Sequence, residues 1–369
     1  MFDFLVVGGG RVGLGLAQAL AAEPAVQVGL VEAGPLASPR RPRPGWTLPT
    51  QVQPGLNGRA VTLSSGKGLG GAGAWGAAAP AVHLPSNLEL FSEALAVRVL
   101  LRARRAVGLE FHRAGLVQQL HASRAVVLCG GAPQSPLLLL RSGIGPHAQL
   151  VAHGVATQLD LPGVGWGLQA PVQLRLALHR GLLGVLRRRP SSDPGAARPA
   201  APLAPGLRLQ RLHDALLLEL AQPASRGRVF LHGKDPYQPP LLDPDLLSER
   251  EDAVALAQAV RALPPWLAAQ GLRLGRTWQA AASDLALEGL LRERAEPGAG
   301  LAGGCLRGDG PQDVVDAQLA VHGLAGLYVA DASVLAALPR AGGGDALETL
   351  ARPLAQALLG GSVRAQDLG

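Results

Sequence analysis

The first 32 residues change their apolar periodicity in an order typical of a βαβ unit. A continuous apolar run at residues 4–7 is followed by a glycine-rich turn at 8–13 and then by apolar residues at helical spacing, Leu14, Leu16, Ala17 and Leu20. A second apolar run at residues 26–31 ends at Glu32. The pattern predicts a strand, a tight turn, a helix and a second strand, within the roughly 30 residues that such a unit needs.

Shorter apolar runs along the rest of the chain predict further elements. We expect strands at residues 88–91, 97–101, 106–111, 125–129, 216–220, 227–231 and 326–330, and helices at 135–141, 249–263 and 346–359. Two segments rich in proline and arginine, residues 35–54 and 187–205, are predicted to be loops, and residues 66–76 form a second glycine-rich turn.

The composition indicates a large globular protein with one big or two intermingled domains. The chain has 369 residues, of which 48% are hydrophobic and 17% charged, which excludes wholesale disorder. Its net charge is +7, but the arginines are scattered apart from the run Arg187, Arg188 and Arg189, and aromatic residues make up only 3%. A binding face for nucleic acid would need a basic stripe with stacking aromatics, so we expect no nucleic-acid partner and leave the role of Arg187–Arg189 open.

Cysteine content and the N-terminal sequence bear on compartment and metal binding. Cys129 and Cys305 are the only cysteines, too few for a disulfide framework, and no Cys/His cluster has the spacing of zinc ligands. The chain starts in a strand pattern without a signal-like segment, and no apolar run reaches the roughly 18 residues of a membrane span. We expect a cytoplasmic protein with no membrane span and no metal site.

The glycine turn has the spacing of a dinucleotide-binding motif. Gly8, Gly10 and Gly13 form G-x-G-x-x-G between a strand and a helix, and Glu32 follows 19 residues later at a strand end. In such a motif the glycines allow the tight turn, the approach of a pyrophosphate and close helix packing, and the carboxylate accepts ribose hydroxyls. A carboxylate there favours FAD or NAD over NADP. The alternative is a plain glycine turn with Glu32 in solvent.

A longer motif identifies a family resemblance. The segment GAPQSPLLLLRSGIG, residues 131–145, resembles the second signature of the glucose-methanol-choline (GMC) oxidoreductases, flavoproteins that oxidise alcohols. Other segments resemble that family in the same order: VVGGGRVGLGLA near the start, GKGLGG at 66–71, DLPGVG at 160–165, SRGRVFL at 225–231, DPYQPPLLDPDLL at 235–247 and VVDAQLAVHGLAGLYVADASV at 314–334. The resemblance therefore runs from end to end.

The resemblance implies an α/β fold with a Rossmann-like FAD-binding domain and an inserted α+β substrate domain. It assigns residues 1–169 and 300–369 to the FAD domain, and 170–299, with the Pro/Arg-rich loop at 187–205, to a reduced substrate domain. About ten residues, 77–86, bridge a gap that is long in the family.

The resemblance also implies roles for individual residues around FAD. Gly8, Gly10 and Gly13 would face the pyrophosphate and Glu32 the adenosine ribose. Ala96 would meet adenine through its backbone, and Gly70 and Gly71 would pass close to the cofactor. Asp331 and Ala332 would lie near the ribityl chain and pyrophosphate, although Asp331 is also a typical cap or turn residue.

The positions that carry the family's chemistry depart from its pattern. The family's H-P-x-G-T-C-R-M-G segment, which supplies a histidine base, reads GLAGGCLRG here, so Gly300 stands where the base is expected. Gly344 stands where an Asn or His precedes the last helix, and the serines and asparagine of the first signature are replaced in residues 70–76. We considered His322, Asp345 and Glu348 as substitute bases, but packing or helix-dipole roles are commoner for such residues. Cys305 is best interpreted as a small buried residue, and the catalytic residues stay unassigned.

Three functions follow from this pattern. The first is an FAD-dependent oxidoreductase that oxidises the CH–OH group of a small-molecule alcohol by hydride transfer to flavin N5, with an electron acceptor that the sequence does not identify. The second is a catalytically silent relative that serves as a binding or scaffold protein, because Gly300 and Gly344 supply no base. The third, weaker interpretation is a flavoprotein of non-oxidative chemistry.

Overall fold

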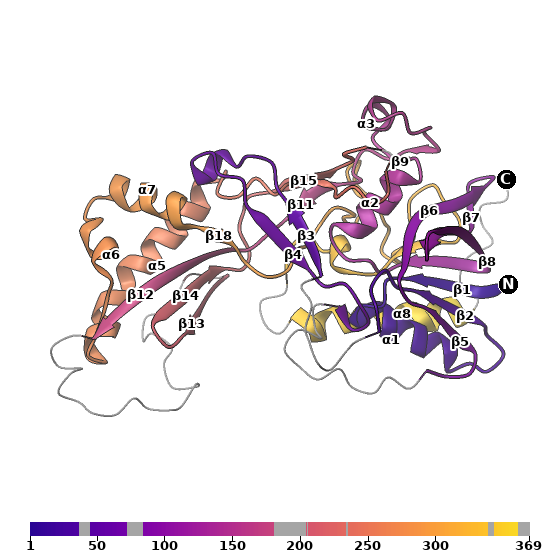
Figure 1. Ribbon diagram of the computed structural model, residues 1–369, viewed down its shortest axis with the longest axis horizontal. Helices are drawn as coiled ribbons and strands as arrows, with labels where there is room; N and C mark the ends of the chain where they lie inside the picture. The colour runs from indigo at the N-terminus through magenta and orange to yellow at the C-terminus, as the bar shows by residue number, and fades with distance from the viewer. Residues whose placement is uncertain are drawn as a thin grey trace.

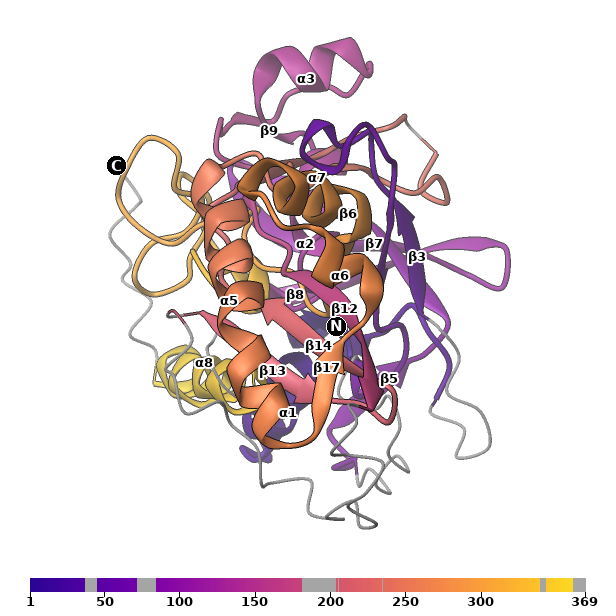
Figure 2. The same cartoon turned by 90° about the vertical axis from the view of Figure 1, so that its left-hand side faces the viewer.

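The computed structural model describes residues 1–36, 45–71, 84–180, 204, 206–233, 235–338 and 343–360. Two lobes lie side by side along the long axis of the molecule (Figure 1). One lobe holds the N-terminus and a mixed sheet, and the other is built from strands β12 (Val172–Arg180), β13 (Leu207–Arg211) and β14 (Ala215–Leu220) and helices α5 (Arg250–Ala269), α6 (Arg276–Ala280) and α7 (Asp284–Arg294) (Figures 1 and 2).

The sheet of the first lobe grows from the predicted βαβ unit. Strand β1 pairs in parallel with β2 on one side and β8 on the other, and the sheet order is β5-β2-β1-β8-β7-β6, with β19 also paired to β8. Strand β8 is shared: its first half pairs antiparallel with β7, and its second half pairs in parallel with β1 and β19. The elements are β1 (Phe2–Val7), α1 (Arg11–Ala21), β2 (Val28–Val31), β5 (Leu88–Phe91), β6 (Ala94–Arg102), β7 (Arg105–Arg113), β8 (Leu116–Leu128) and β19 (Leu327–Val329).

Helices cover this sheet because its central strands are apolar on both faces. Residues 4–7 and 28–31 are all buried, as expected for parallel strands. Helices α1 and α8 (Gly343–Leu359) pack together on one face (Figure 1). Helix α2 (Gln134–Arg141) packs against β6, followed by β9 (Ile144–Gly145), α3 (His147–Ala152) and β10 (Leu159–Asp160). The strand ends that face the second lobe thus stay open for a ligand.

The second lobe is an antiparallel sheet backed by helices. Its order is β13-β14-β12-β17, with β18 also paired to β12. Val172, Leu174 and Leu176 of β12 are buried, whereas Arg175 and Ala177, on the opposite face of the strand, are exposed, so one sheet face packs on the helices and the other faces solvent. The elements are β12 (Val172–Arg180), β13 (Leu207–Arg211), β14 (Ala215–Leu220), α5 (Arg250–Ala269), β17 (Leu272–Leu274), α6 (Arg276–Ala280), α7 (Asp284–Arg294) and β18 (Glu296–Pro297).

Small sheets join the lobes. Strands β11 (Trp166–Leu168), β15 (Gly227–Phe230) and β16 (Leu241–Asp243) form one, and the hairpin β3 (Trp46–Pro49) and β4 (Thr62–Ser65) forms another, bridged to it through Thr50 and Leu242. Short 3-10 turns lie at η1 (Pro54–Leu56) and η3 (Ala332–Val334). The chain enters the second lobe at β12 and leaves it after β18, close to residues 170 and 299, while the division into domains stays a prediction.

The predicted elements are confirmed in kind, but some are corrected, and several elements, among them α3, β13, α6 and α7, were not predicted. The segment 35–54 is not loop throughout, because Trp46–Pro49 pairs with Thr62–Ser65 as a hairpin. Helix α8 begins at Gly343, so Gly344 lies in its first turn and not in a loop before it. Strand β12 was missed, although its apolar residues alternate. The loop predicted at 187–205 and residues Arg187–Arg189 fall outside the described residues, apart from position 204.

Within the described part of the chain, no helix has the length and apolar character needed to cross a bilayer. The same residues contain no group of three or more His, Cys, Asp or Glu side chains arranged to hold a metal ion.

Candidate cofactor cavity

The glycine turn is closed on one side by backbone and open on the other. A Cβ at Gly8, where φ is +106°, would lie 2.4 Å from the carbonyl oxygen of Cys129, and a Cβ at Gly13 would lie 1.9 Å from that of Gly8. No atom lies within 4 Å of a Cβ built on Gly10, the N-cap of α1. Gly8 and Gly10 line a cavity and Gly13 does not. The third glycine therefore serves close helix packing, and the second leaves room beside the N-terminus of α1.

Glu32 ties three loops together at the end of β2. Its side chain is buried, Oε2 accepts a hydrogen bond from the Gly9 N–H at 2.7 Å, and Oε1 accepts from Gly34 at 2.7 Å and Gly68 at 2.9 Å. The interpretation of Glu32 as a solvent-facing residue is therefore wrong. A carboxylate has about four acceptor directions, so one stays available toward the cavity that Glu32 lines.

The second glycine turn is fastened to the first. The Gly70 N–H donates to the Gly9 carbonyl at 2.8 Å, and a Cβ on Gly71 would lie 3.1 Å from the Gly10 Cα. Gly70 and Gly71 have φ of +89° and +56°, and both line the cavity. Residues 72–76, the remainder of the first signature, lie outside the described part of the chain.

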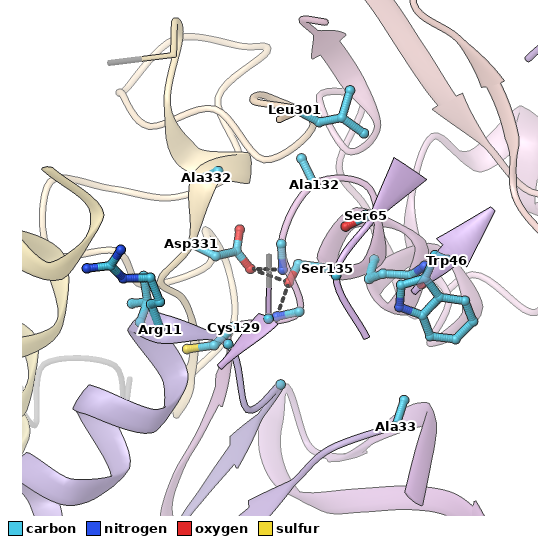
Figure 3. Close-up of a pocket in the computed structure, with 18 of the residues that line it drawn as sticks. Arg11, Ala33, Trp46, Ser65, Cys129, Ala132, Ser135, Leu301, Asp331 and Ala332 are labelled. Atoms are coloured by element: carbon cyan, nitrogen blue, oxygen red, sulfur yellow. Dashed lines mark hydrogen bonds between the residues drawn. The ribbon is translucent and has the colours of Figure 1, made fainter. Parts of the chain in front are cut away.

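Asp331 holds the loops together at the ends of β19 and β8, on the other side of β1 from Glu32. Its Oδ2 accepts from the Gly131 N–H at 2.8 Å and the Ser135 hydroxyl at 2.6 Å (Figure 3), and its Oδ1 accepts from the Ser333 N–H at 2.8 Å. Ser135 in turn accepts from the Gly130 N–H at 3.1 Å. Asp331 is thus the cap of η3, as the alternative interpretation had it, and Asp331 and Ala332 also line the cavity.

The cavity has a volume of about 470 Å³ and runs from these strand ends toward the second lobe. Beyond the glycine turns, Ala33, Trp46 and Ser65 line one part of it (Figure 3). Ala96 lines it as well, beside a β-bulge: Ala96 pairs with Phe111 and Arg98 with Glu110, so Val97 is an extra residue in β6. A bulge releases backbone groups from the ladder, next to the position expected to meet adenine.

The far part of the cavity has few polar groups. It is lined by Pro171, Arg208, Ala221 and the stretch Ala299–Leu301, with Leu338 beside them. Gly300 has φ of +91°, and the nearest atom to a Cβ built there is a Leu338 methyl carbon at 3.8 Å. There is space for a side chain at position 300, but an L residue would be strained there.

No histidine lines the cavity within the described residues, and its acidic lining residues are Glu32 and Asp331. His322 lies elsewhere, with Nε2 2.8 Å from the Gly308 carbonyl oxygen, which supports a structural role. Burial, with a smaller contribution from Asp331, raises the pKa values of the Cys129 and Cys305 thiols well above their ordinary value, so both are poor nucleophiles. The side chains of Asp345 and Glu348 fall outside the described residues.

Sequence reasoning missed the cationic lining. Arg11 opens α1 beside the glycine turn, and Arg141 ends α2. Burial lowers the pKa of Arg141 to about 10, opposed by the charge of Asp235, and the buried Nε of Arg141 has no hydrogen-bond partner among the described residues. Arg141 lies inside the signature at 131–145, three residues after Leu138, which also lines the cavity. Because residues three apart on a helix share a face, the spacing from Leu138 is the sequence signal that could have placed Arg141 at the cavity.

Comparisons with known proteins agree on one family. Two models described as GMC oxidoreductase match residues 75–179 and 223–342. The alcohol dehydrogenase [acceptor] of Pseudomonas putida is 31% identical over 302 residues, 68% of this chain and 54% of the relative. The oxygen-dependent choline dehydrogenase of Yersinia pseudotuberculosis is 31% identical over 298 residues, 68% of this chain and 52% of the relative. The chain spans about half the length of the curated relatives it matches.

Solved structures share the fold at lower sequence identity. Pyridoxine 4-oxidase from Mesorbium loti has a TM-score of 0.80 and 20% identity, covering 96% of this chain and 99% of that one. An FAD-dependent oxidoreductase from Chaetomium thermophilum has a TM-score of 0.83 and 17% identity, covering 99% and 100%. The α/β fold of the two lobes is thus shared with these solved structures.

Proposed function

Because the chain belongs to the GMC oxidoreductase family, we propose that it binds FAD in the cavity and oxidises the CH–OH group of a small alcohol. When bound, FAD supplies a flavin ring that accepts a hydride at N5. The chain itself would bind and orient the cofactor and the alcohol. Because the chain spans about half the length of its relatives, the alcohol and the electron acceptor are left open.

The residues at the strand ends fit a dinucleotide. Gly10 leaves open space beside the N-terminus of α1, where backbone N–H groups favour an anion, and Arg11 adds a positive charge there. Glu32 retains one acceptor direction toward a ribose hydroxyl, and the bulge at Val97 places the backbone of Ala96 at the cavity wall. Asp331 holds the turn at Gly130–Gly131 against the same space.

The observation that carries the proposal is the fastening of both glycine turns around an open Gly10. Glu32 accepts hydrogen bonds from Gly9 and Gly68, and Gly70 donates to Gly9. These bonds fix the two turns to each other and leave open the space beside Gly10 that a pyrophosphate would fill. Preorganised donors of this kind lower the cost of ordering a ligand.

The test is a visible spectrum of the purified protein after incubation with FAD and gel filtration. We expect flavin bands at about one FAD per chain, and their loss in Gly10→Val, which fills the open space. Gly15→Ala is the matched control, because its Cβ meets no atom within 4 Å and Gly15 does not line the cavity. A colourless wild type, or equal FAD in the Gly10→Val variant, would refute FAD binding in this cavity.

A second function, a silent FAD-binding relative, is favoured by the lining of the cavity. Its described residues offer no histidine, and both acidic side chains are engaged by backbone or hydroxyl donors. General bases contribute about 10² to 10⁴ in rate, so flavin positioning alone would leave weak turnover. Anaerobic bleaching of the flavin by any member of a panel of primary alcohols supports the oxidoreductase, and a stable oxidised spectrum with all of them supports the silent relative.

A further inference from the structure

We propose that the second lobe carries a binding site for the phosphate groups of a small phosphorylated molecule, in a groove separate from the cofactor cavity. The groove has a volume of about 810 Å³ and lies between the exposed face of β12, strand β17, helix α6 and the end of α7. We call it the basic groove. Its wall includes Arg175, His179, Arg273, Arg276 and Arg294, and it shares no described residue with the wall of the cofactor cavity.

The sheet pattern brings these side chains together. Arg175 and His179 stand four residues apart on β12 and therefore point to the same face, opposite the buried leucines. The antiparallel register pairs His179 directly with Arg273 of β17. The Gly275 N–H donates to the Ala177 carbonyl at 2.8 Å, which holds the start of α6 and hence Arg276 against β12.

The charges around the basic groove are only partly neutralised. Arg175 pairs with Asp214 at 2.9 Å, and Arg294 pairs with Glu293 at 3.2 Å. Arg273 and Arg276 have no carboxylate within 4.0 Å among the described residues, and no acidic residue lines the groove. Arg273 and Arg276 are exposed, so both guanidinium groups are accessible to an anion in the groove, and a bound anion would offset their like charge.

Guanidinium chemistry favours phosphate. Its planar fork of donors matches two phosphate oxygens at once, and several forks around one hollow fit a group with two or more negative charges. The arginines come from four elements around one hollow that has Trp278, 8% exposed, in its wall, and they do not form the long stripe that an acidic polypeptide would need. The volume lies within the range of small-molecule pockets, roughly 300 to 1,000 Å³.

The experiment is isothermal titration calorimetry of the full chain with inorganic pyrophosphate, after loading with FAD and removal of free FAD by gel filtration, so that unbound flavin does not compete for the basic groove. Orthophosphate and adenosine 5′-diphosphate are titrated in parallel to separate a free phosphate from an organic phosphate ester. We expect pyrophosphate or the diphosphate ester to bind, and Arg273→Gln/Arg276→Gln to weaken binding at least tenfold. The matched control is Arg102→Gln/Arg104→Gln, which removes two exposed charges at the β6–β7 turn and changes the affinity less than twofold.

Three results would overturn the proposal. One is the absence of binding heat for all three ligands with the wild type. Another is an equal loss of affinity in both double variants, which would indicate diffuse attraction by the net charge of +7. The last is tighter binding of poly-L-glutamate than of pyrophosphate, which would assign the groove to an acidic polypeptide. Because FAD content is read separately from the flavin absorbance, failure of the proposed cofactor binding would be seen independently.

Discussion

The two ends of the cofactor cavity differ in how firmly their residues are held. At the strand ends of the first lobe, Glu32 and Asp331 each accept three hydrogen bonds, and Gly8 and Gly13 leave no room for a Cβ. At the far end, Gly300 and Leu301 face aliphatic side chains and Arg208. The residues are thus held firmly in place where a dinucleotide would lie. Where an alcohol would react, the lining offers few groups that could accept a proton.

This contrast shows that binding and catalysis depend on separable parts of the chain. The part of the cavity at the strand ends of the first lobe, around Gly10, Glu32 and Asp331, is called the firm end; it is formed by backbone groups that a few side chains hold in place. The part around Gly300 and Leu301 is called the bare end, and catalysis there would depend on one side chain with a suitable pKa and position.

The largest effect is expected for Gly13→Ala at the firm end. Its Cβ would meet the Gly8 carbonyl oxygen at 1.9 Å, so α1 must move away from the turn. We expect a loss of stability on the order of 4 kcal/mol, with loss of bound FAD, in thermal unfolding and flavin absorbance. Gly15→Ala in the same helix has free space and should gain up to about 1 kcal/mol. Similar melting of both variants would contradict the close packing.

Next comes Asp331→Ala, which removes the acceptor for three donors. We expect a loss of about 3 kcal/mol in denaturant unfolding, because the Gly131 and Ser333 N–H groups and the Ser135 hydroxyl lose their partner. Asp331→Asn keeps one acceptor oxygen and should lose less. If the two substitutions are equally harmful, charge at Asp331 matters more than its hydrogen bonds.

A smaller effect is expected for Gly300→Ala and Gly300→His at the bare end. Leu338 is 3.8 Å from the new Cβ, so the cost comes from φ of +91° and not from a clash. We expect each to lose about 1 to 3 kcal/mol. We also expect Gly300→His to leave flavin bleaching by alcohols unchanged, because the backbone does not hold a side chain at position 300 in an ordinary geometry. Faster bleaching in Gly300→His than in Gly300→Ala would show that the missing base alone limits turnover.

The smallest effect concerns the pH dependence of two Glu–Arg pairs. Burial raises the pKa of Glu219 above 4.5 in spite of Arg208. The contribution of Glu219 to stability is therefore greatest at low pH and falls as the pH rises through its folded pKa. In urea unfolding at pH 4 to 7, the free energy of unfolding of Glu219→Gln, relative to that of the wild type, should increase as the pH rises.

Glu110 supplies the control with the opposite sign. Burial raises its pKa, but hydrogen bonds from Arg98 and Gln119 outweigh burial and bring it below 4.5. The contribution of Glu110 is present above its ordinary pKa and is lost as the pH falls. The free energy of unfolding of Glu110→Gln, relative to that of the wild type, should therefore decrease as the pH rises. If both variants changed in the same direction with pH, the difference between the two Glu–Arg pairs would be contradicted.

The sequence predicted the glycine turn and Glu32 at the firm end, but neither the hydrogen bonds of Asp331 there nor the lining of the bare end. Local spacing determined the glycine turn, α1, β2 and Glu32, because a βαβ unit is completed within a short stretch of chain. The contact between Ser135 and Asp331 joins residues 196 positions apart, so no local pattern indicates it. The same holds for Arg208, which reaches the cavity from β13 through strand pairing.

One conclusion from the sequence was changed by backbone conformation. Gly344 was expected in a loop but lies in the first turn of α8, and residue identity alone does not specify the dihedral angles that extend the helix to it. Gly13 packs against Gly8 and does not line the cavity, in agreement with the helix-packing role of the third glycine. The roles toward FAD stay predictions for all the assigned residues, Gly8, Gly10, Gly13, Glu32, Gly70, Gly71, Ala96, Asp331 and Ala332.

The φ of +91° at Gly300 also limits how this part of the cavity could be redesigned. An L residue at position 300 is strained by its backbone angles before its side chain can contribute any chemistry. A designer who wants a proton acceptor in this region would therefore place it on a neighbouring residue with ordinary backbone angles, or would first rebuild the segment around position 300.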